Sequence, residues 1–219
     1  MYHFHIADDH PLFRNALLGV ISKDFPEVTT SQSFDYTSTF EMLENNRETD
    51  LLLLDLNMPG NQDLIGLIKL RENFPLVPLV VISATENTNT ISRAMGHGAS
   101  GYIPKTATAI EISEALTAVL EGETWLPLFV RGKLKSIDKE EKELAAKVAT
   151  LTTHQFRVMQ LIQEGLLNKQ IAHELCISEA TVKAHITTIF KKLGASNRTQ
   201  AVVLFSNMAL DNNTENQVE

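Results

Sequence analysis

The sequence contains a single cysteine, Cys176, and no long run of apolar residues. One cysteine excludes an internal disulfide and a cysteine-based zinc site, and it agrees with a reducing compartment. We expect Cys176 to be a small core side chain. No stretch approaches the ~18 apolar residues of a membrane span, and the first residues lack the basic region and apolar core of a signal peptide. These absences predict a cytoplasmic protein with no membrane partner.

Charged residues are unevenly distributed along the 219 residues, whose net charge is -8. Residues 1–122 hold 7 basic and 16 acidic side chains, whereas residues 147–205 hold 7 basic and 3 acidic ones. The length fits two domains. A basic module joined to an acidic one indicates that the second module binds a polyanion such as DNA.

Four consecutive leucines, residues 51–54, precede Asp55 and a Pro59-Gly60 turn. An unbroken apolar run is typical of a strand buried on both faces of a parallel sheet. Further strands are predicted at 2–7, 28–34, 77–82 and 101–103, with helices at about 11–21, 35–45, 62–72, 87–95 and 108–119. Alternating strands and helices predict an α/β fold, a doubly wound five-stranded parallel sheet.

Polar side chains follow four of the five predicted strands at the point where each strand ends. They are Asp8, Asp9, Asp55, Asn57, Ser83 and Lys105. Each alone has an ordinary structural explanation, such as a helix cap or a turn. Because the carboxyl ends of parallel strands lie at one edge of the sheet, we expect all six to converge there.

Three carboxylates at one place repel one another unless a cation lies between them. Mg²⁺ prefers oxygen ligands and keeps several waters. We therefore expect Asp9, Asp55 and the carbonyl of Asn57 to bind it, and Asp8 to act mainly through a bound water. The remaining positions suit phosphoryl oxygens. Asp55 is then the nucleophile of a phosphoryl transfer, and Lys105 and Ser83 contact the transferred group.

Residues 1 to about 122 resemble the receiver domain of bacterial two-component response regulators. The resemblance lies in Asp8-Asp9, the run 55–60, Ser83-Ala84 and the run 98–105. It implies a flavodoxin-like receiver in which Asp55 accepts a phosphoryl group from a histidine kinase in the presence of Mg²⁺. It also implies that Ser83 and Tyr102 are a switch pair, the hydroxyl turning toward the phosphoryl group while the aromatic ring moves inward.

Beyond the receiver we expect a linker, residues 123–147, with Trp125 packing back on the first domain. Residues 148–209 have the helical spacing of a small all-α domain, with a short helix at 168–175 and a longer one at 179–193 after a tight turn. That pair is a helix-turn-helix pattern. A last helix, 199–208, supplies either a dimer contact or closure of the core, and residues 210–219 are expected to be a disordered tail.

The stretch 165–201 resembles the DNA-binding domain of LuxR/FixJ-type (NarL-type) regulators. The matching runs are 168–172, Ile177-Ser178, 181–185 and 192–201. The resemblance implies that Lys183, Ala184 and Thr187 face DNA bases and that Lys169, Thr181 and Lys191 lie near phosphates. The sequence departs from the family at His154-Gln155, where an Arg-Glu pair is usual, and at Leu167 and Gln170, where Ser and Glu are common. Because of these departures, the resemblance does not predict the polar contacts near the first helix of the domain.

Together the two resemblances predict a DNA-binding response regulator that is phosphorylated on Asp55 and is no classical enzyme, its chemistry being self-phosphotransfer and autodephosphorylation. The expected partners are a histidine kinase, promoter DNA, a second copy in an active homodimer, and RNA polymerase. Two alternatives stay open, a LuxR-type factor that binds DNA whatever its phosphorylation state and an aspartate-nucleophile phosphatase. The phosphatase is disfavoured because such sites resemble Asp-x-Asp, whereas this chain has Asp55-Leu56-Asn57.

Overall fold

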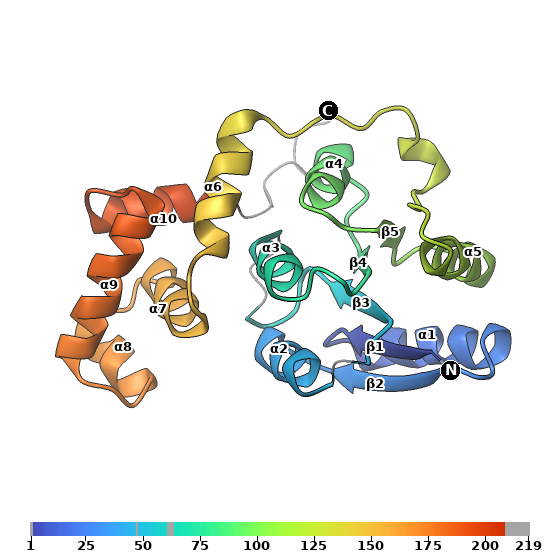
Figure 1. The fold of residues 1–219 in the computed structure, drawn as a ribbon, viewed down its shortest axis with the longest axis horizontal. Coiled ribbons are helices and arrows are strands. Elements are labelled where there is room, and N and C mark those ends of the chain that lie inside the picture. Colours follow the sequence, from blue (N-terminus) through green and yellow to red (C-terminus); the bar gives the residue numbers. More distant parts are fainter. Residues whose placement is uncertain (1, 47, 61–63, 209–219) are drawn as a thin grey trace, which may run out of the picture. The chain divides into compact units, whose positions relative to one another are not determined.

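The computed structural model describes residues 2–46, 48–60 and 64–208. The chain divides into two compact units, residues 1–137 and 138–219. Figure 1 labels the helices and strands of both units. The division falls inside the segment 123–147 that the sequence suggested as a linker, and the expected disordered tail, 210–219, lies outside the described residues.

The first unit is built on a five-stranded sheet with the order β2-β1-β3-β4-β5. Its strands are β1 His3–Ala7, β2 Thr29–Ser33, β3 Leu51–Asp55, β4 Leu79–Ser83 and β5 Gly101–Pro104. All four neighbouring pairs are parallel. The predicted doubly wound parallel sheet is therefore confirmed, with strand order changing direction between β1 and β3.

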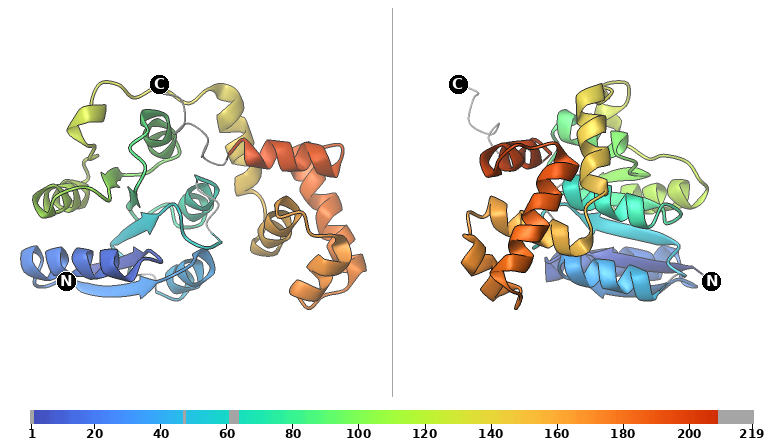
Figure 2. Two further views of the ribbon diagram at one scale, coloured as in Figure 1. Left: turned by 180° about the vertical axis from the view of Figure 1, so that it is seen from behind. Right: turned by 60° about the vertical axis from the view of Figure 1, so that its left-hand side comes forward.

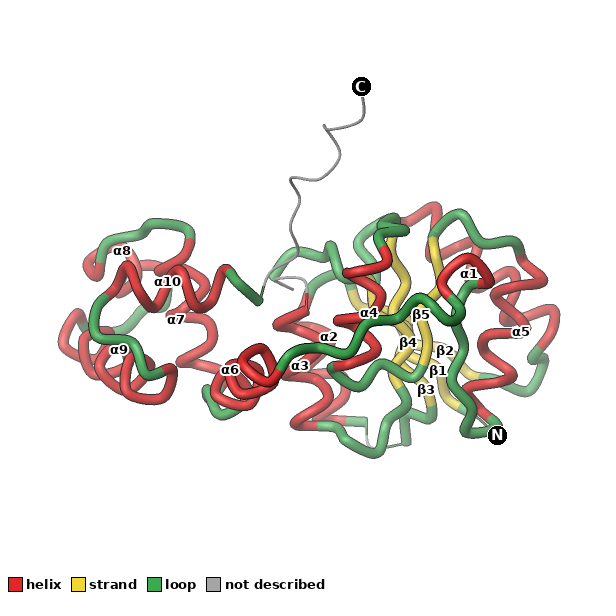
Figure 3. The backbone as a smooth tube through the Cα atoms, turned by 90° about the horizontal axis from the view of Figure 1, so that it is seen from above, coloured by secondary structure: helices red, strands yellow, loops and turns green. Residues whose placement is uncertain are grey.

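Five helices cover the two faces of this sheet. They are α1 Pro11–Asp24, α2 Tyr36–Asn45, α3 Leu64–Asn73, α4 Thr88–Gly96 and α5 Ala109–Leu120. Figure 3 shows α1 and α5 on one face and α2, α3 and α4 on the other. Leu51 and Leu53 belong to the cluster beneath α1 and α5, and Leu52 and Leu54 are equally buried. The leucine run therefore serves two hydrophobic layers, as a strand covered on both faces must.

Polar side chains cap the starts of α2, α4 and α5. The carboxylate of Asp35 accepts the backbone N–H of Ser38 at 2.8 Å, and Asn87 caps α4. Thr108 and Glu111 form the capping box expected at the start of α5. These caps satisfy N–H groups that a helix cannot satisfy internally, so the predicted helix starts are reproduced at these positions.

The segment after α5 packs back on the first unit, as expected for Trp125. The side chain of Trp125 is buried, and the carbonyl of Trp125 accepts the backbone N–H of Tyr102 at 3.1 Å. A short 3-10 helix, η1 Leu128–Val130, follows. The chain then reaches α4, where the N–H of Lys135 donates to the hydroxyl of Ser92.

The second unit contains α6 Lys139–Ala149, α7 Thr153–Gln163, α8 Asn168–Glu174, α9 Glu179–Leu193 and α10 Arg198–Ser206. Figure 2 shows these helices from two further sides. The rings of Phe156 and Phe205, 6.0 Å apart, join α7 to α10 in the core. Helix α6 buries Ala145 and Val148 and packs against α9, so this part of the expected linker is an element of the second unit.

Two further findings concern the chain as a whole. Cys176 is exposed, with a φ of 52° in the turn between α8 and α9, so the prediction of a core cysteine is wrong. Among the described residues, no helix combines the length and apolarity needed to cross a membrane.

Candidate functional site

The carboxylates that follow β1 and β3 meet at the carboxyl edge of the sheet, as predicted. Asp8 and Asp55 are both 1% exposed, whereas the side chain of Asp9 is 31% exposed. One ligand atom from each of Asp8, Asp9, His10 and Asp55 lies within 4.8 Å of the others. The sheet topology therefore gathers into one cluster groups that lie 47 positions apart in the sequence, Asp8 and Asp55.

Lys105, which follows β5, provides the cation nearest to this cluster. Its Nζ lies 2.8 Å from Oδ2 of Asp55 and 2.9 Å from Oδ2 of Asp8. Burial alone lowers the pKa of Lys105, but hydrogen bonds to the two carboxylates raise it overall above its usual value. Lys105 therefore stays charged and ties β5 to the ends of β1 and β3.

The carboxyl group of Asp55 is held from two sides. Its Oδ2 accepts from Lys105, and its Oδ1 accepts the backbone N–H of Asn57 at 3.1 Å. Burial raises the pKa of Asp55, and these two hydrogen bonds offset part of that rise. Asn57 was expected to contribute its carbonyl, and the structure places its N–H against Asp55 in the turn that follows β3.

The oxygens of the cluster suit a divalent cation. Among the described residues, Oδ1 of Asp9 is buried and has no hydrogen-bond donor, and Oδ2 of Asp8 is compensated by Lys105 alone. Buried carboxylate oxygens without donors are costly unless a cation neutralises them. Oxygen ligands around a partly exposed position fit Mg²⁺, which retains waters.

Ser83 and Tyr102 lie on neighbouring strands, and both are fully buried. Oγ of Ser83 accepts the backbone N–H of Thr85 at 3.2 Å, and the hydroxyl of Tyr102 donates to the carbonyl of Thr85 at 2.7 Å. Burial raises the pKa of Tyr102 to about 12, so the phenol is neutral. The ring of Tyr102 thus lies inside the fold in this structure, connected through Thr85 to the loop that leads into α4.

His10 belongs to the site although the sequence reading did not single it out. Its Nδ1 lies 2.7 Å from Oδ1 of Asp9, 3.3 Å from Oδ1 of Asp8 and 3.7 Å from Oδ2 of Asp55. The available signal was its position directly after Asp8-Asp9, at the N-cap of α1 and before Pro11. A histidine next to paired acids in a turn is a potential metal ligand in its own right.

The second unit presents the residues expected to contact DNA. Thr181, Lys183, Ala184, Thr187 and Lys191 are all exposed on α9, and Lys169 is exposed on α8. Val182, Ile189 and Leu193 are buried on the opposite side of α9, whereas Ile186 and Phe190, also expected inward, are only partly buried. The helix therefore has one face in the core and one polar face free to enter a groove.

The structure shows which hydrogen bonds form at Gln155 and Gln170, two of the positions where the sequence departs from the family pattern. Oε1 of Gln155 accepts from the backbone N–H of Thr152 at 3.2 Å and from Nζ of Lys192 at 2.7 Å, which ties α7 to α9. At α8, the side chain of Gln170 accepts the backbone N–H of Leu167 at 2.7 Å. The aliphatic side chain of Leu167 cannot accept in return, so half of that capping interaction is lost.

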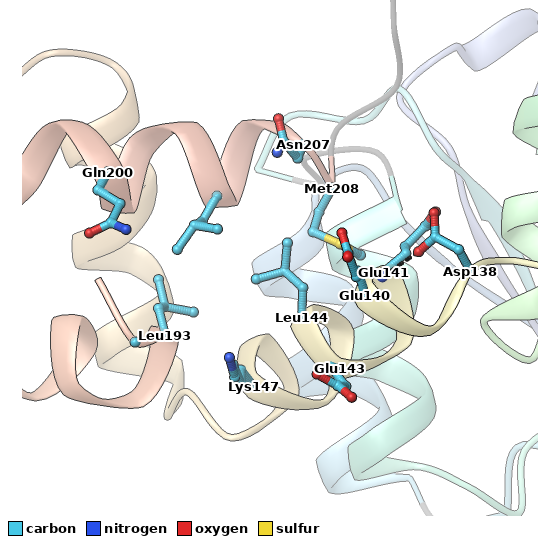
Figure 4. Close-up of a pocket in the computed structure, with 12 residues that line it drawn as sticks. Asp138, Glu140, Glu141, Glu143, Leu144, Lys147, Leu193, Gln200, Asn207 and Met208 are labelled. Atoms are coloured by element: carbon cyan, nitrogen blue, oxygen red, sulfur yellow. Dashed lines mark hydrogen bonds between the residues drawn. The ribbon is translucent and has the colours of Figure 1, made fainter. Parts of the chain in front are cut away.

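A groove of about 430 Å³ lies in the second unit between α6, the end of α9 and α10. Figure 4 shows apolar side chains lining it, among them Leu144, Leu193 and Met208, together with acidic residues of α6. It contains none of the residues expected to contact DNA. The groove is therefore separate from the candidate DNA-binding face of α9.

A parallel sheet with acidic residues and a lysine at its carboxyl edge, followed by a helix-turn-helix unit, defines a class of regulator. Residues 4–117 match the model of the response regulator receiver domain, and residues 149–205 match that of bacterial regulatory proteins of the luxR family. The chain belongs to the response regulators that carry a luxR-family DNA-binding domain, and it is a regulator of transcription.

Several individual regulators are similar to it over almost their whole length. The chain is 38% identical over 208 residues to the glycerol metabolism activator of Pseudomonas putida, covering 93% of this chain and 94% of that protein. It is 32% identical over 199 residues to the nitrate/nitrite response regulator NarL of Escherichia coli K12, covering 90% and 92%. RcsB of Salmonella enterica serovar Typhimurium, solved on the promoter rprA with the phosphomimetic BeF3-, has a TM-score of 0.55 and 25% identity, covering 95% of this chain and 100% of that chain.

Proposed function

We propose that this regulator accepts a phosphoryl group on Asp55 from a histidine kinase, and that phosphorylation controls promoter binding by the second unit. The contact between Lys105 Nζ and Asp55 Oδ2, at 2.8 Å, carries the proposal. It places a fixed positive charge at a buried carboxylate among two further acids. Its site of action is the cytoplasm, because a regulator must share a compartment with promoter DNA.

The transfer is a direct exchange of one bond to phosphorus for another. An oxygen of Asp55 forms a bond to the phosphorus as the nitrogen–phosphorus bond of the phosphohistidine breaks, and the released histidine nitrogen keeps the electron pair and takes up a proton. Lys105 neutralises charge on the phosphoryl oxygens. Asp8, Asp9, Asp55 and the carbonyl of Asn57 would hold Mg²⁺, which supplies further positive charge when bound. Water then attacks the phosphorus of the acyl phosphate, which restores the carboxylate of Asp55 and releases inorganic phosphate. Both proposed steps take place on Asp55 of the chain itself.

The hydroxyl of Ser83 is the group through which phosphorylation would reach the rest of the first unit. If it turns toward a phosphoryl oxygen, it gives up the backbone N–H of Thr85. Thr85 also accepts the hydroxyl of Tyr102 and lies just before Asn87, the cap of α4. A change at Ser83 is thereby linked to Tyr102 and to the start of α4, which makes this pair the proposed switch.

In the second unit, α9 is the proposed reading helix. Lys183, Ala184 and Thr187 would face bases, while Lys169, Thr181 and Lys191 would lie near phosphates. Their exposure supports this assignment. RcsB has been solved as dimers bound to DNA, and we infer that the active form of this chain is likewise a homodimer on paired half-sites, with α10 as a contact and RNA polymerase as the eventual partner.

The test is phosphorylation of the full chain by a small phosphodonor with Mg²⁺, followed by intact mass. The parent should gain one phosphoryl group and Asp55→Asn none. Lys105→Met should be phosphorylated at least about tenfold more slowly than the parent, because the substitution removes the charge that stabilises the transition state. Equal modification of Asp55→Asn would show that another residue is the acceptor.

A further inference from the structure

We propose that His10 is a fourth side-chain ligand of the cation site, and that it makes the site select Mn²⁺ and similar transition-metal ions over Mg²⁺. The inference rests on the proposed function, since it concerns the cation expected beside Asp55. It adds a nitrogen donor to a set of ligands that otherwise consists of oxygens.

The distances around Nδ1 of His10 match those between ligands of one ion. Neighbouring ligands of an octahedral ion lie about 3.0 Å apart, because bonds of roughly 2.1 Å meet at right angles. Nδ1 of His10 lies 2.7 Å, 3.3 Å and 3.7 Å from oxygens of Asp9, Asp8 and Asp55. One ligand atom from each of the four residues also falls within 4.8 Å of the others. Small adjustments would bring all four to a common ion.

An unsatisfied oxygen next to the ring supports a shared cation. Oδ1 of Asp9 is buried and has no hydrogen-bond partner among the described residues, although Nδ1 of His10 is only 2.7 Å away. Nζ of Lys105, an ammonium group that can only donate, also lies 3.3 Å from Nδ1 of His10, so Nδ1 accepts from Lys105 and presents a lone pair to the cluster. Two lone-pair atoms this close repel each other unless a cation binds both, and the imidazole of His10 is a suitable ligand for such a cation.

The backbone holds His10 in place for this role. Its N–H donates to Oδ1 of Asp8 at 2.7 Å, and the following Pro11 fixes the chain at the first turn of α1. The side chain remains 61% exposed, so the ring has room to adjust. Lys105 pairs with Oδ2 of Asp8, which leaves Oδ1 of Asp8 to the ion. Its Nζ also contacts Oδ2 of Asp55 and Nδ1 of His10, so an ion bound by His10 shares the first of these atoms with Lys105 and replaces Lys105 at the second.

The chemistry of the donors gives the selectivity. Mg²⁺ strongly prefers oxygen ligands and gains little from imidazole. Mn²⁺ accepts carboxylates and imidazole, and later ions of the first row bind nitrogen more tightly still. His10 should therefore raise the affinity for Mn²⁺ and leave the affinity for Mg²⁺ nearly unchanged.

The experiment is calorimetric titration of the full chain with Mn²⁺ and, separately, with Mg²⁺ at one pH. His10→Ala should raise the Kd for Mn²⁺ about tenfold and the Kd for Mg²⁺ less than about twofold. Pulsed electron paramagnetic resonance of Mn²⁺ bound to the parent should show coupling to a histidine nitrogen, which His10→Ala abolishes. His173→Ala, which removes an exposed histidine of α8, should change none of these values.

Three results would overturn the proposal. They are the absence of nitrogen coupling in the parent, equal weakening of both ions by His10→Ala, and tighter binding of both ions by that variant, as expected if the ring merely blocks the site. The coupling is measured in the parent, so it does not depend on the folding of a variant. It is also independent of phosphorylation, so failure of Asp55 as an acceptor would be seen separately.

Discussion

The backbone N–H of Lys135 donates a hydrogen bond to the hydroxyl of Ser92, a residue of α4 that lies 43 positions earlier, at 3.1 Å. Two residues later, Ile137 packs on Gly96 at the end of the same helix. A Cβ atom built on Gly96 would come within 3.0 Å of Cγ1 of Ile137. Helix α4 therefore holds the stretch of chain that leads directly to the N-cap of α6, Asp138.

Gly96→Ala should loosen this stretch, because the new methyl group displaces Ile137. Overpacking of this kind costs about 1–3 kcal/mol, so trypsin should cleave after the exposed Lys133 and Lys135 roughly tenfold faster. The matched control is Gly19→Ala in α1, where an added Cβ meets nothing within 4 Å. Equal cleavage of the parent and both variants would show that α4 does not hold the segment.

A second variant sharpens this test through its coupling to Gly96. Ile137→Ala alone also removes the contact with α4 and should speed cleavage. In the double variant, Gly96→Ala no longer forces out a large side chain, so its effect should be smaller than in the parent background. Strict additivity of the two effects would mean that the residues do not interact.

His5 makes the stability of the first unit depend on pH. Burial, with the neighbouring His3, lowers the pKa of His5 to about 4, from its usual value of 6.5. The unfolded chain then binds more protons between these values, so this contribution is fully present above about pH 6.5 and is lost as the pH falls toward 4. It amounts to on the order of 3 kcal/mol.

The measurement is urea unfolding, followed by the fluorescence of Trp125, at pH 5 and pH 7.5. In His5→Gln, which keeps polar contacts available to Ser31 and Ser33, the loss on acidification should be smaller than in the parent. The difference between the two proteins isolates His5 from the carboxylates of the site. An identical loss in both would mean that His5 is not protonated on unfolding.

Leu167 weakens the start of α8, where no side chain accepts an N–H of the first turn. Leu167→Ser supplies an acceptor and should stabilise the second unit by about 0.5–1.5 kcal/mol. Ser178→Ala, which removes the cap of α9 that accepts the N–H of Thr181, should cost a similar amount. Amide hydrogen exchange in α7 to α10 of the full chain reports both. Slower exchange in Ser178→Ala, or faster exchange in Leu167→Ser, would contradict the assignment of the caps.

Much of the fold was predictable because local signals agree with the tertiary arrangement. The leucines at 51–54 indicate a doubly covered strand, and the caps at Asp35 and Thr108 mark helix starts by chemistry that is local in sequence. The convergence of Asp8, Asp55 and Lys105 followed from the topology, since parallel strands place their carboxyl ends at one edge.

Other features depend on packing that no local pattern reveals. The position of His10 depends on how its ring turns toward three carboxylates from two strands. The mixed charges of α6 suggested a connector, yet its small residues Ala145 and Val148 are buried in the second unit. Cys176 looked like a core residue by type, but the turn after α8 leaves it exposed.

The most direct test of the account is the affinity of the full chain for promoter DNA, with Mg²⁺, before and after treatment with a small phosphodonor, alongside Asp55→Asn. The account predicts tighter binding and dimer formation after treatment in the parent and no change in Asp55→Asn. Equal affinity of both proteins, with and without the donor, would contradict it: the second unit would still bind DNA, but Asp55 would not be the switch.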